Sequence, residues 1–232
     1  MKKSFTAIVL SALSLALVAA TQPEPTPTPE QEKETAEIGE KAPDFTLKDQ
    51  FGRTQKLSDY EGKIVVLEWF NELCPFCLNA WGGGLLPKVL EDLGEMKTKV
   101  VYLAVNSTAN KSKEKIFESG KKFLEDIKIN IPLLSDYDGE VGRAYGAKTT
   151  PHMFVIDTEG ILVYQGALSD DKRFKKGKKA KIYILNAVEQ VIAGEEVSPS
   201  YMKPWGCSVK YAKEGEDKRN IPNRGMNPGP LL

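Results

Sequence analysis

Two cysteines three residues apart follow closely on an apolar run, and this arrangement constrains the fold more than any other feature of the chain. Residues 64–70 (I-V-V-L-E-W-F) are β-branched, apolar or aromatic except for Glu68, a pattern that predicts a buried strand. Cys74 and Cys77 follow, and Pro75 suits the first turn of a helix, where its missing N–H costs nothing. A thiol at a helix N-terminus has a lowered pKa, because free amides and the helix dipole stabilise the thiolate. The stretch therefore predicts a strand, a turn and a helix that opens on a reactive cysteine pair.

The first twenty residues have the pattern of an export signal. Met1-Lys2-Lys3 precede an apolar run over residues 7–20 that only serines interrupt, and Val18-Ala19-Ala20 suits cleavage before Thr21. The run is shorter than the roughly 20 residues that a membrane span needs, and no other stretch could span a membrane. We therefore expect an exported protein, periplasmic or extracellular, with no membrane span in its mature chain. An uncleaved segment would instead tether it.

Composition divides the remaining chain into a linker, one domain and a tail. Residues 21–37 are rich in Pro, Glu and Thr, which predicts a semi-rigid spacer. Residues 38–210 alternate strand and helix patterns, which predicts one α/β domain with a sheet covered on both faces. Residues 211–232 are rich in Gly, Pro, Asn and charge, which predicts a flexible tail. The chain has 32 basic and 32 acidic residues, and this balance argues against nucleic acid as a partner.

Local patterns predict the main elements of the domain. A hairpin turns at residues 49–53, and a second one turns at residues 158–160. Buried or extended segments are expected at residues 64–70, 99–105, 131–134 and 153–157, and helices at residues 85–96, 113–127, 140–145 and 181–193. Three glycines, residues 82–84, follow the helix that begins after Cys74. Since each glycine costs a helix about 1 kcal/mol relative to alanine, we expect a break there.

Three separate segments together resemble the thioredoxin superfamily. They are C-P-F-C (residues 74–77) after a buried strand, Thr150-Pro151 before a later strand, and the opening K-A-P-D-F-T-L-K-D-Q-F-G-R of residues 41–53. The opening is similar to the redoxin (AhpC/TSA-like) branch, which includes peroxiredoxins and exported thioredoxin-like oxidoreductases. The resemblance covers about residues 38–194. It implies a thioredoxin-like fold, with a central mixed sheet flanked by helices and an N-terminal hairpin extension.

The resemblance also implies roles for the residues in these motifs. Cys74 would be the nucleophile, and Cys77 would resolve the mixed disulfide, since exchange needs an accessible thiolate with a second thiol within reach. Pro151 would match the family's cis-proline and would lie beside the cysteine pair. The backbone of Thr150 would then pair with a substrate chain. The implied reaction is thiol–disulfide exchange with protein thiols and disulfides, supplied by an external electron donor or acceptor and requiring no cofactor besides the Cys74–Cys77 pair.

Glu68 is the one ionisable residue in the apolar strand, six residues before Cys74. Thioredoxins have a buried carboxylate at the matching position, and a buried carboxyl with a raised pKa could take the proton of Cys77. Alternatively, Glu68 faces an edge or pairs with a lysine such as Lys63. Further residues near the motifs are expected to contact substrate: Trp69, Pro75, Phe76 and His152. Alternatively, Trp69 is an aromatic of the core or of the site wall, and His152 is a strand residue packed beside Pro151.

Cys207 lies far from the other two cysteines, in the segment K-P-W-G-C-S-V-K of residues 203–210. This segment is similar to the closing motif of exported redoxin-domain proteins of unassigned activity. Two interpretations stay open for its thiol. Cys207 is either a free thiol packed against the domain or a third redox thiol that pairs with Cys74 or with an external partner.

We expect a monomer that carries out thiol–disulfide exchange, and two other functions are alternatives to this reaction. Peroxiredoxins carry Thr or Ser three residues before the peroxidatic cysteine, whereas here Asn71 precedes Cys74 and Cys74 itself precedes Cys77. The peroxidase pattern is therefore absent. A soft-metal module for copper or zinc could use three cysteines and the single histidine, His152. Related copper-handling redoxins use C-x-x-x-C, however, and the spacing here is shorter, so we expect no bound metal.

Overall fold

The computed structural model describes residues 35–96 and 100–212. The expected export signal, the linker up to residue 34 and the tail from residue 213 lie outside the described residues. None of the helices in the described part of the chain combines the length and the apolar character needed to cross a membrane.

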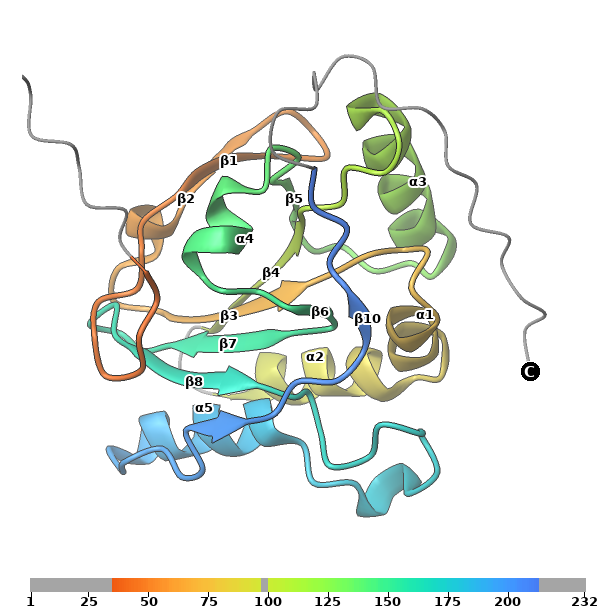
Figure 1. Ribbon diagram of the computed structural model, residues 1–232. Helices are drawn as coiled ribbons and strands as arrows, with labels where there is room; N and C mark the ends of the chain where they lie inside the picture. The colour runs from red at the N-terminus through yellow and green to blue at the C-terminus, as the bar shows by residue number, and fades with distance from the viewer. Residues whose placement is uncertain (1–34, 97–99, 213–232) are drawn as a thin grey trace, which may run out of the picture. The chain divides into compact units, whose positions relative to one another are not determined.

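The described elements follow one another in the order shown in Figure 1. They are β1 (Thr46–Asp49), β2 (Thr54–Lys56), the 3-10 helix η1 (Leu57–Tyr60), β3 (Ile64–Trp69), α1 (Pro75–Gly82), α2 (Leu85–Glu95), β4 (Val100–Asn106), α3 (Lys113–Asp126), β5 (Leu133–Ser135), α4 (Glu140–Ala144), β6 (Thr149–Thr150), β7 (Met153–Ile156), β8 (Leu162–Gly166), the 3-10 helix η2 (Gly177–Lys179), α5 (Tyr183–Ala193), β9 (Tyr201–Met202) and β10 (Cys207–Ser208).

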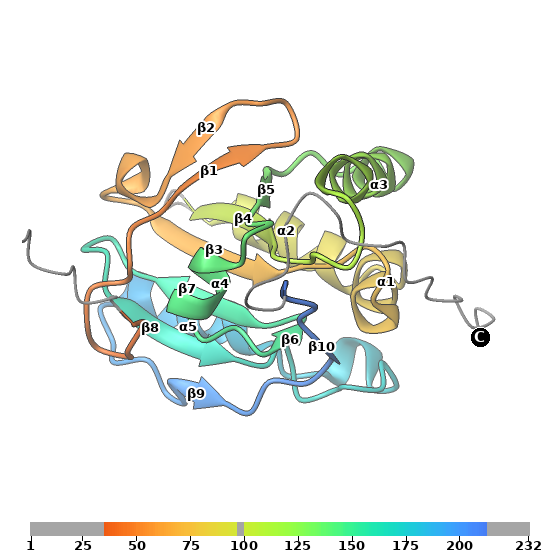
Figure 2. The same cartoon turned by 45° about the horizontal axis from the view of Figure 1, so that its top comes forward.

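A mixed sheet forms the centre of the domain. Its strand order is β2-β1-β5-β4-β3-β7-β8-β9, from one edge to the other in Figure 2. Strand β3 lies parallel to β4 and antiparallel to β7. Every residue of β3 is buried, as its apolar sequence predicts. The predicted class is therefore confirmed: this is a thioredoxin-like fold with helices flanking a central mixed sheet.

The two predicted hairpins are confirmed, and they lie on opposite sides of β3 in the strand order of the sheet. Strands β1 and β2 pair antiparallel, and β1 also pairs with β5, so the N-terminal hairpin extends the sheet beyond β5. Strands β7 and β8 form the second hairpin, with Val155 opposite Tyr164. The turn of the first hairpin is held by Asp49, whose carboxylate accepts hydrogen bonds from the amides of Phe51 and Arg53 at 2.9 and 3.0 Å.

The glycine run breaks the helix where the sequence predicts it. Helix α1 ends at Gly82 and α2 begins at Leu85. Gly84 has a φ of +81°, in the left-handed region that glycine adopts without a Cβ penalty. A Cβ on Gly83 would lie 2.5 Å from the carbonyl oxygen of Asn79, so this position also excludes a side chain. The break lets α1 carry the cysteines while α2 packs along the sheet.

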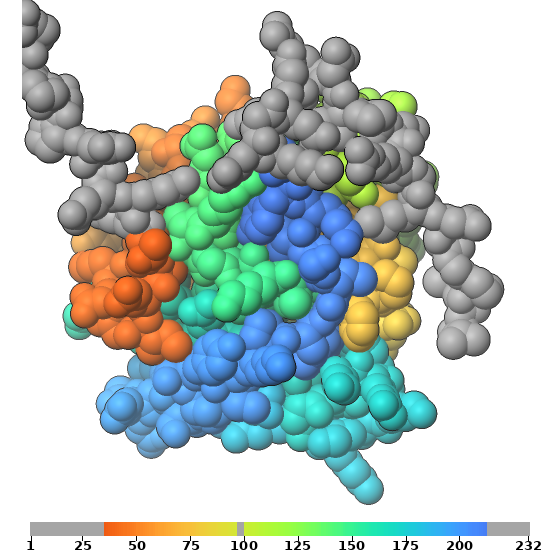
Figure 3. Space-filling model, in the orientation of Figure 1, coloured from red at the N-terminus to blue at the C-terminus, as the bar shows by residue number. Residues whose placement is uncertain are grey.

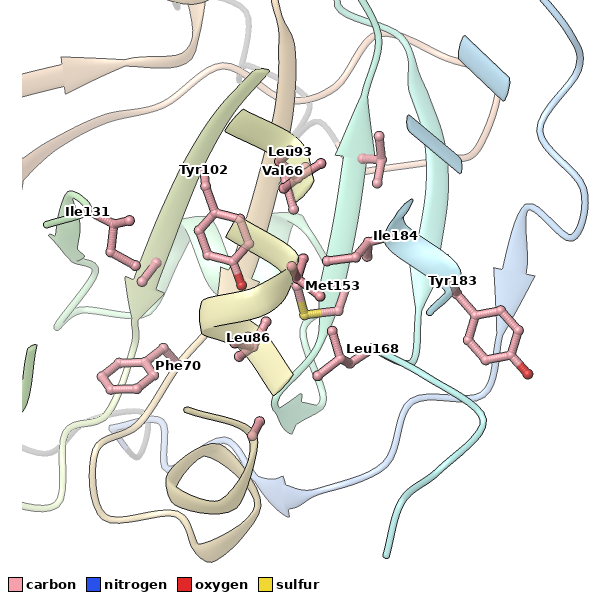
Figure 4. Packing of buried hydrophobic residues seen from close by; sticks show 14 of the residues in the cluster. Val66, Phe70, Leu86, Leu93, Tyr102, Ile131, Met153, Leu168, Tyr183 and Ile184 are labelled. Carbon is pink, nitrogen blue, oxygen red and sulfur yellow. The ribbon is translucent and has the colours of Figure 1, made fainter. Parts of the chain in front are cut away.

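The sheet separates two apolar clusters. The larger one includes Cys74 and Cys77, and β3, α2, β7 and α5 contribute to it through Val66, Leu93, Met153 and Ile184 (Figure 4). The smaller one lies on the opposite face. Its members come from alternate positions of the same strands, including Leu67, Trp69 and Phe154. This division follows from the period of two along a strand, and it decides which side chains can reach the cysteines.

Several features near the ends of the domain were not predicted. Strands β6, β9 and β10 are new, and β10 forms a separate two-stranded sheet with β6. The amide of Ala36, expected in the linker, donates to the carbonyl of Ala144 at 2.8 Å. At the other end Tyr211, expected in the tail, donates its hydroxyl proton to the carbonyl of Ala147 at 2.9 Å. The described domain thus extends slightly beyond residues 38–210 on both sides.

Candidate active site

The cysteine pair lies where β3 turns into α1. Cys74 is the N-cap residue of α1, and Pro75 occupies the first turn. The connecting turn is held by Asn71, whose side-chain oxygen accepts the amide of Leu73 at 2.8 Å and whose carbonyl accepts the amide of Cys74 at 3.0 Å. The sequence motif therefore becomes the predicted unit of strand, turn and helix, with the first sulfur at the helix N-terminus.

The sulfur of Cys74 lies among donors that favour its thiolate. The thiol of Cys77 donates to it, and this bond is the largest cause that lowers the pKa of Cys74 to about 5, against the opposing effect of burial. The thiol of Cys207 donates to it as well. Cys74 is therefore ionised at neutral pH, which is the state that attacks a disulfide.

Cys77 has the opposite electrostatic character. It is fully buried, and burial is the first cause that raises its pKa well above 9.0. The hydrogen bond to Cys74 and the negative charges of Glu68 and Cys74 raise the pKa further. The pair therefore holds a single proton at neutral pH, and that proton resides on Cys77.

Glu68 lies on the cysteine side of the sheet and is fully buried. Its carboxylate accepts hydrogen bonds from the hydroxyl of Tyr102 at 2.9 Å and from the indole N–H of Trp81 at 3.3 Å. Burial raises the pKa of Glu68 from 4.5 to about 8, and these two bonds reduce the rise. The alternative of an edge position, or of a pair with Lys63, does not fit these partners.

Tyr102 and Trp81 are site residues whose role the sequence did not disclose. Trp81 follows Cys77 by one helical turn, so helical spacing could have placed it on the same face as that cysteine. Tyr102 belongs to another strand, and only the register that pairs Glu68 with Ala104 brings its ring to the carboxyl group. That register is not encoded in any short motif.

Pro151 and Thr150 lie on the opposite wall of the site. The Thr150–Pro151 peptide bond is cis, as the resemblance implies. The thiol of Cys74 lies 2.9 Å from the carbonyl oxygen of Thr150. In this structure the chain itself pairs with the strand expected to receive substrate, because Cys207 of β10 lies opposite Thr150 of β6. Cys207 is therefore part of the site, although it is distant in sequence.

Two residues expected to contact substrate are inside the protein, which corrects those expectations. Trp69 is fully buried on the face opposite to Glu68, where its indole N–H donates to the hydroxyl of Ser107 at 2.9 Å. His152 is 1% exposed and packs on Phe154 with ring centroids 4.5 Å apart. Burial lowers the pKa of His152 to about 3, so it is neutral. The physical reason is strand alternation: neighbours of site residues along a strand point away from the site.

The other two expected contacts lie on the outer side of α1. Pro75 is exposed and Phe76 is partly buried. The ring of Phe76 lies 6.0 Å from that of Trp205, just before β10. The surface around Cys74 is therefore made of α1 on one side and of the chain around β10 on the other.

A second buried carboxylate lies close to the site but has different partners. Glu72 is 6% exposed and accepts hydrogen bonds from the side-chain amide of Asn106 at 3.2 Å and from the hydroxyl of Ser119. Burial raises its pKa. Its partners therefore differ from those of Glu68, whose charge is among the causes that raise the pKa of Cys77.

The four residues of the alternative metal module, the three cysteines and His152, do not lie together. The three cysteines gather at the start of α1, whereas His152 packs with the cluster on the other face of the sheet. Within residues 35–96 and 100–212, no group of three or more His, Cys, Asp or Glu side chains is placed to hold a metal ion.

Comparison with known proteins gives relatives of similar length. Thiol-disulfide oxidoreductase ResA of Geobacillus thermodenitrificans is 30% identical over 165 residues, which cover 69% of this chain and 86% of the relative. A protein of Porphyra purpurea named as a peroxiredoxin, ycf42, is 28% identical over 181 residues, which cover 72% of this chain and 86% of that relative. The crystal structure of a hypothetical protein from Sinorhizobium meliloti 1021 superposes with a TM-score of 0.66 at 26% identity, covering 77% of this chain and 97% of that one.

The family assignment follows from a match over more than half of the sequence. Residues 38–165 match the model of the AhpC/TSA family. The matched range contains β3, the cysteine pair and the cis-proline, and it ends before β9 and β10. Cys207 and its strand lie outside the matched range. By this match, the chain belongs to the AhpC/TSA family.

Proposed function

We propose that the protein is an exported thiol–disulfide oxidoreductase that exchanges disulfides with protein substrates through Cys74 and Cys77. The observation that carries this proposal is the contrast between the two sulfurs, one ionised at the start of α1 and one protonated and buried behind it. The name of the ResA relative agrees with this class of enzyme. The redox group is the cysteine pair, and no further cofactor is needed.

The first chemical step uses the thiolate of Cys74. It attacks one sulfur of a substrate disulfide, a bond forms between Cys74 and that sulfur, and the other substrate sulfur leaves as a thiolate. The thiolate in the enzyme exists at neutral pH because its pKa is about 5. The mixed disulfide that results carries no charge on Cys74.

Formation of the mixed disulfide activates Cys77. The hydrogen bond to Cys74 and the charge of Cys74 both raise the pKa of Cys77, and both vanish when Cys74 is bonded to substrate. Glu68, with a pKa of about 8, accepts the proton of Cys77 in the molecules in which its carboxyl is ionised, and this fraction grows as the pH rises toward 8. The Cys77 thiolate attacks the sulfur of Cys74 and expels the substrate as a thiolate. Two electrons have moved from the enzyme pair to the substrate disulfide, and the reverse sequence oxidises a substrate dithiol.

The setting of this reaction rests on the N-terminal sequence and on the class of partner. The basic start and short apolar run of residues 1–20 support export, and they lie outside the described residues. The protein acts as a monomer on protein thiols and disulfides, with a separate protein as its electron donor or acceptor. A measured reduction potential of the Cys74–Cys77 couple near −270 mV favours a reductase, and one near −120 mV an oxidase.

The test uses chains in which Cys207 is also replaced by serine, so that a single pair remains. Cys74→Ser is expected to abolish the reduction of a protein disulfide such as that of insulin, and Cys77→Ser is expected to accumulate a mixed disulfide with the substrate. Asn79→Ser, at an exposed position of α1, is the matched control and should keep full activity. Undiminished turnover in the Cys74→Ser chain would refute the proposed mechanism.

A further inference from the structure

We propose that Cys207 is a second resolving thiol: β10 holds it where a substrate cysteine would lie, and it forms a disulfide with Cys74 in competition with Cys77. This inference rests on the proposed role of Cys74 as nucleophile and goes beyond it, because the pair then becomes a set of three exchanging thiols. All three cysteines are thiols in the structure.

The first support is the position of β10. Cys207 lies opposite Thr150 and Ser208 opposite Thr149 in an antiparallel pair, and the amide of Val209 continues the pairing to the carbonyl of Lys148 at 3.1 Å. Proteins that receive an extended peptide on a strand edge bind it through this type of main-chain pairing. Here the peptide is part of the same chain, and its cysteine reaches the sulfur of Cys74.

The second support is that the segment is fixed on both sides of Cys207. Before it, the indole N–H of Trp205 donates to the carbonyl of Ser169 at 2.9 Å. After it, the carbonyl of Lys210 accepts the amide of Ala109 at 2.8 Å, and the carbonyl of Ala212 accepts a guanidinium N–H of Arg143 at 2.9 Å. In the space-filling view, the blue C-terminal segment runs between the green atoms near α4 and the golden atoms near α1 (Figure 3). Holding a nucleophile in place in this way accelerates its reaction.

The third support is a glycine that lets β10 approach so closely. Gly206 has a φ of +146°, and a Cβ there would lie 2.2 Å from the carbonyl oxygen of Thr150 and 3.1 Å from the nitrogen of Pro151. No side chain fits into this space, so the residue before Cys207 must be glycine for β10 to lie against the cis-proline. The close approach places the Cys207 thiol next to Cys74.

The fourth support is the relative exposure and electrostatics of the three sulfurs. Cys74 is 2% exposed and Cys77 is fully buried, whereas Cys207 is partly exposed. Burial, the hydrogen bond to Cys74 and the charge of Cys74 raise the pKa of Cys207 to about 12, and Lys210 lowers it. When Cys74 enters a mixed disulfide, its two contributions disappear. Cys207 is thus activated at the same moment as Cys77, with Lys210 favouring its thiolate.

The proposed step balances in atoms and electrons. Cys207 gives up its proton and attacks the sulfur of Cys74 in the mixed disulfide. The Cys74–Cys207 bond forms, the bond from Cys74 to the substrate sulfur breaks, and the substrate leaves as a thiolate that takes up a proton. Two thiols of the enzyme are oxidised and one substrate disulfide is reduced, while Cys77 stays a thiol.

The experiment uses the Cys77→Ser chain with less than one equivalent of 4,4′-dithiodipyridine, which releases a coloured thiopyridone at each exchange. The proposal expects two thiopyridones per reagent molecule, the second in a first-order step whose rate does not depend on protein concentration, and a monomeric product. The Cys77→Ser/Cys207→Ser chain is the control and should release one. A lasting mixed disulfide with Cys207 still open to alkylation, or a disulfide-linked dimer, overturns the proposal. If no first thiopyridone is released, Cys74 is not the nucleophile, and the proposed function itself fails.

A backbone variant tests the position of β10 separately. Gly206→Ala in the Cys77→Ser chain should slow the second release on the order of 100-fold, since misplacement by about 1 Å has that effect on a positioned nucleophile. Gly94→Ala is the control, because a Cβ there meets no atom within 4 Å and its φ is not positive. Equal second rates in both glycine variants would count against the inference.

Disulfide mapping of the chain with all three cysteines covers the case in which Cys77→Ser does not fold. Trypsin leaves Cys74 and Cys77 together in the peptide of residues 64–88 and Cys207 in that of residues 182–210. After oxidation by one equivalent of glutathione disulfide, the proposal expects the two peptides to be joined in part of the sample. If they are never joined and Cys207 is alkylated throughout, the proposal fails.

Discussion

Replacing Glu68 by glutamine is expected to make the protein more stable and less active. In the folded chain the carboxyl accepts from Tyr102 and Trp81 and is fully buried. Glutamine has the same shape and no charge. Its oxygen can accept from Trp81, and its amide can donate to the hydroxyl of Tyr102, which then acts as acceptor. The substitution therefore removes the buried ionisation while it retains both partners.

The magnitude follows from the pKa of Glu68, which rises from 4.5 to about 8 on folding. Between these values the folded chain retains a proton that the unfolded chain has lost, so the free energy of unfolding falls as pH rises, by about 1.4 kcal/mol per pH unit. At pH 7 the accumulated cost is roughly 3 kcal/mol, and below the unfolded pKa it is absent. Glu68→Gln should therefore exceed the wild type in stability at pH 7 and match it near pH 4.

Activity should change in the opposite sense. If Glu68 accepts the proton of Cys77, its loss slows the resolving step by about 100-fold, the lower range for a general base, while the first attack by Cys74 keeps its rate. Glu72→Gln is the matched control. It removes another buried carboxyl with a raised pKa, and its hydrogen-bond partners are Asn106 and Ser119 rather than the partners of Glu68, so stability should rise and the resolving step should stay unchanged.

The assay combines urea unfolding of both variants and the wild type at pH 4 to 8 with stopped-flow measurement of the two thiopyridone releases in the Cys207→Ser background. A stability difference for Glu68→Gln that does not change with pH would show that the carboxyl is not held neutral by burial. A resolving step of wild-type rate in Glu68→Gln would show that Cys77 loses its proton elsewhere.

Three further predictions concern the thiolate, a buried network and the alternative reaction. The rate of alkylation of Cys74 by iodoacetamide should reach half its maximum near pH 5. Cys77→Ala should move this midpoint to higher pH, because the hydrogen bond from Cys77 is the largest cause that lowers the pKa of Cys74. An unchanged midpoint would contradict this hydrogen bond. Asp136→Ala should lower the free energy of unfolding by about 3 kcal/mol in denaturant titrations, because the amides of Val141 and Gly142 and the hydroxyl of Ser107 lose their acceptor. Asp138→Ala, at a partly exposed position, is the control and should change the free energy of unfolding little. Hydrogen peroxide should be consumed much more slowly than a protein disulfide, because neither cysteine has the peroxidatic sequence pattern; rapid peroxide turnover that requires Cys74 would instead favour the activity named for the ycf42 relative.

Local sequence was sufficient for most of the fold. The apolar run of β3, the turn residues of the two hairpins and the three glycines after α1 each acted through short-range preferences, so the strands, the hairpins and the helix break lie where predicted. Proline and the cysteine spacing placed Cys74 at the start of α1 for the same reason. Strands β6 and β10 have only two residues each, and each forms by pairing with the other. No local sequence pattern therefore predicts them.

The direction of each side chain was decided partly by sequence and partly by tertiary contacts. Alternation along β3 placed Glu68 and Trp69 on opposite faces, but which face would carry the cysteines depends on how α1 packs back onto the sheet. The prediction that Trp69 and His152 contact substrate was therefore wrong. The ionisation of Glu68 depends on Tyr102 and Trp81, which come from two other elements.

The sequence alone determined that a cysteine begins a helix after a buried strand and that a second thiol lies about one turn further along that helix. Only the tertiary structure decided that there is a third thiol within reach. Cys207 is 133 residues from Cys74 in sequence, and no local rule brings such residues together. They meet because β10 pairs with β6 and because Gly206 has no side chain to hold the two strands apart.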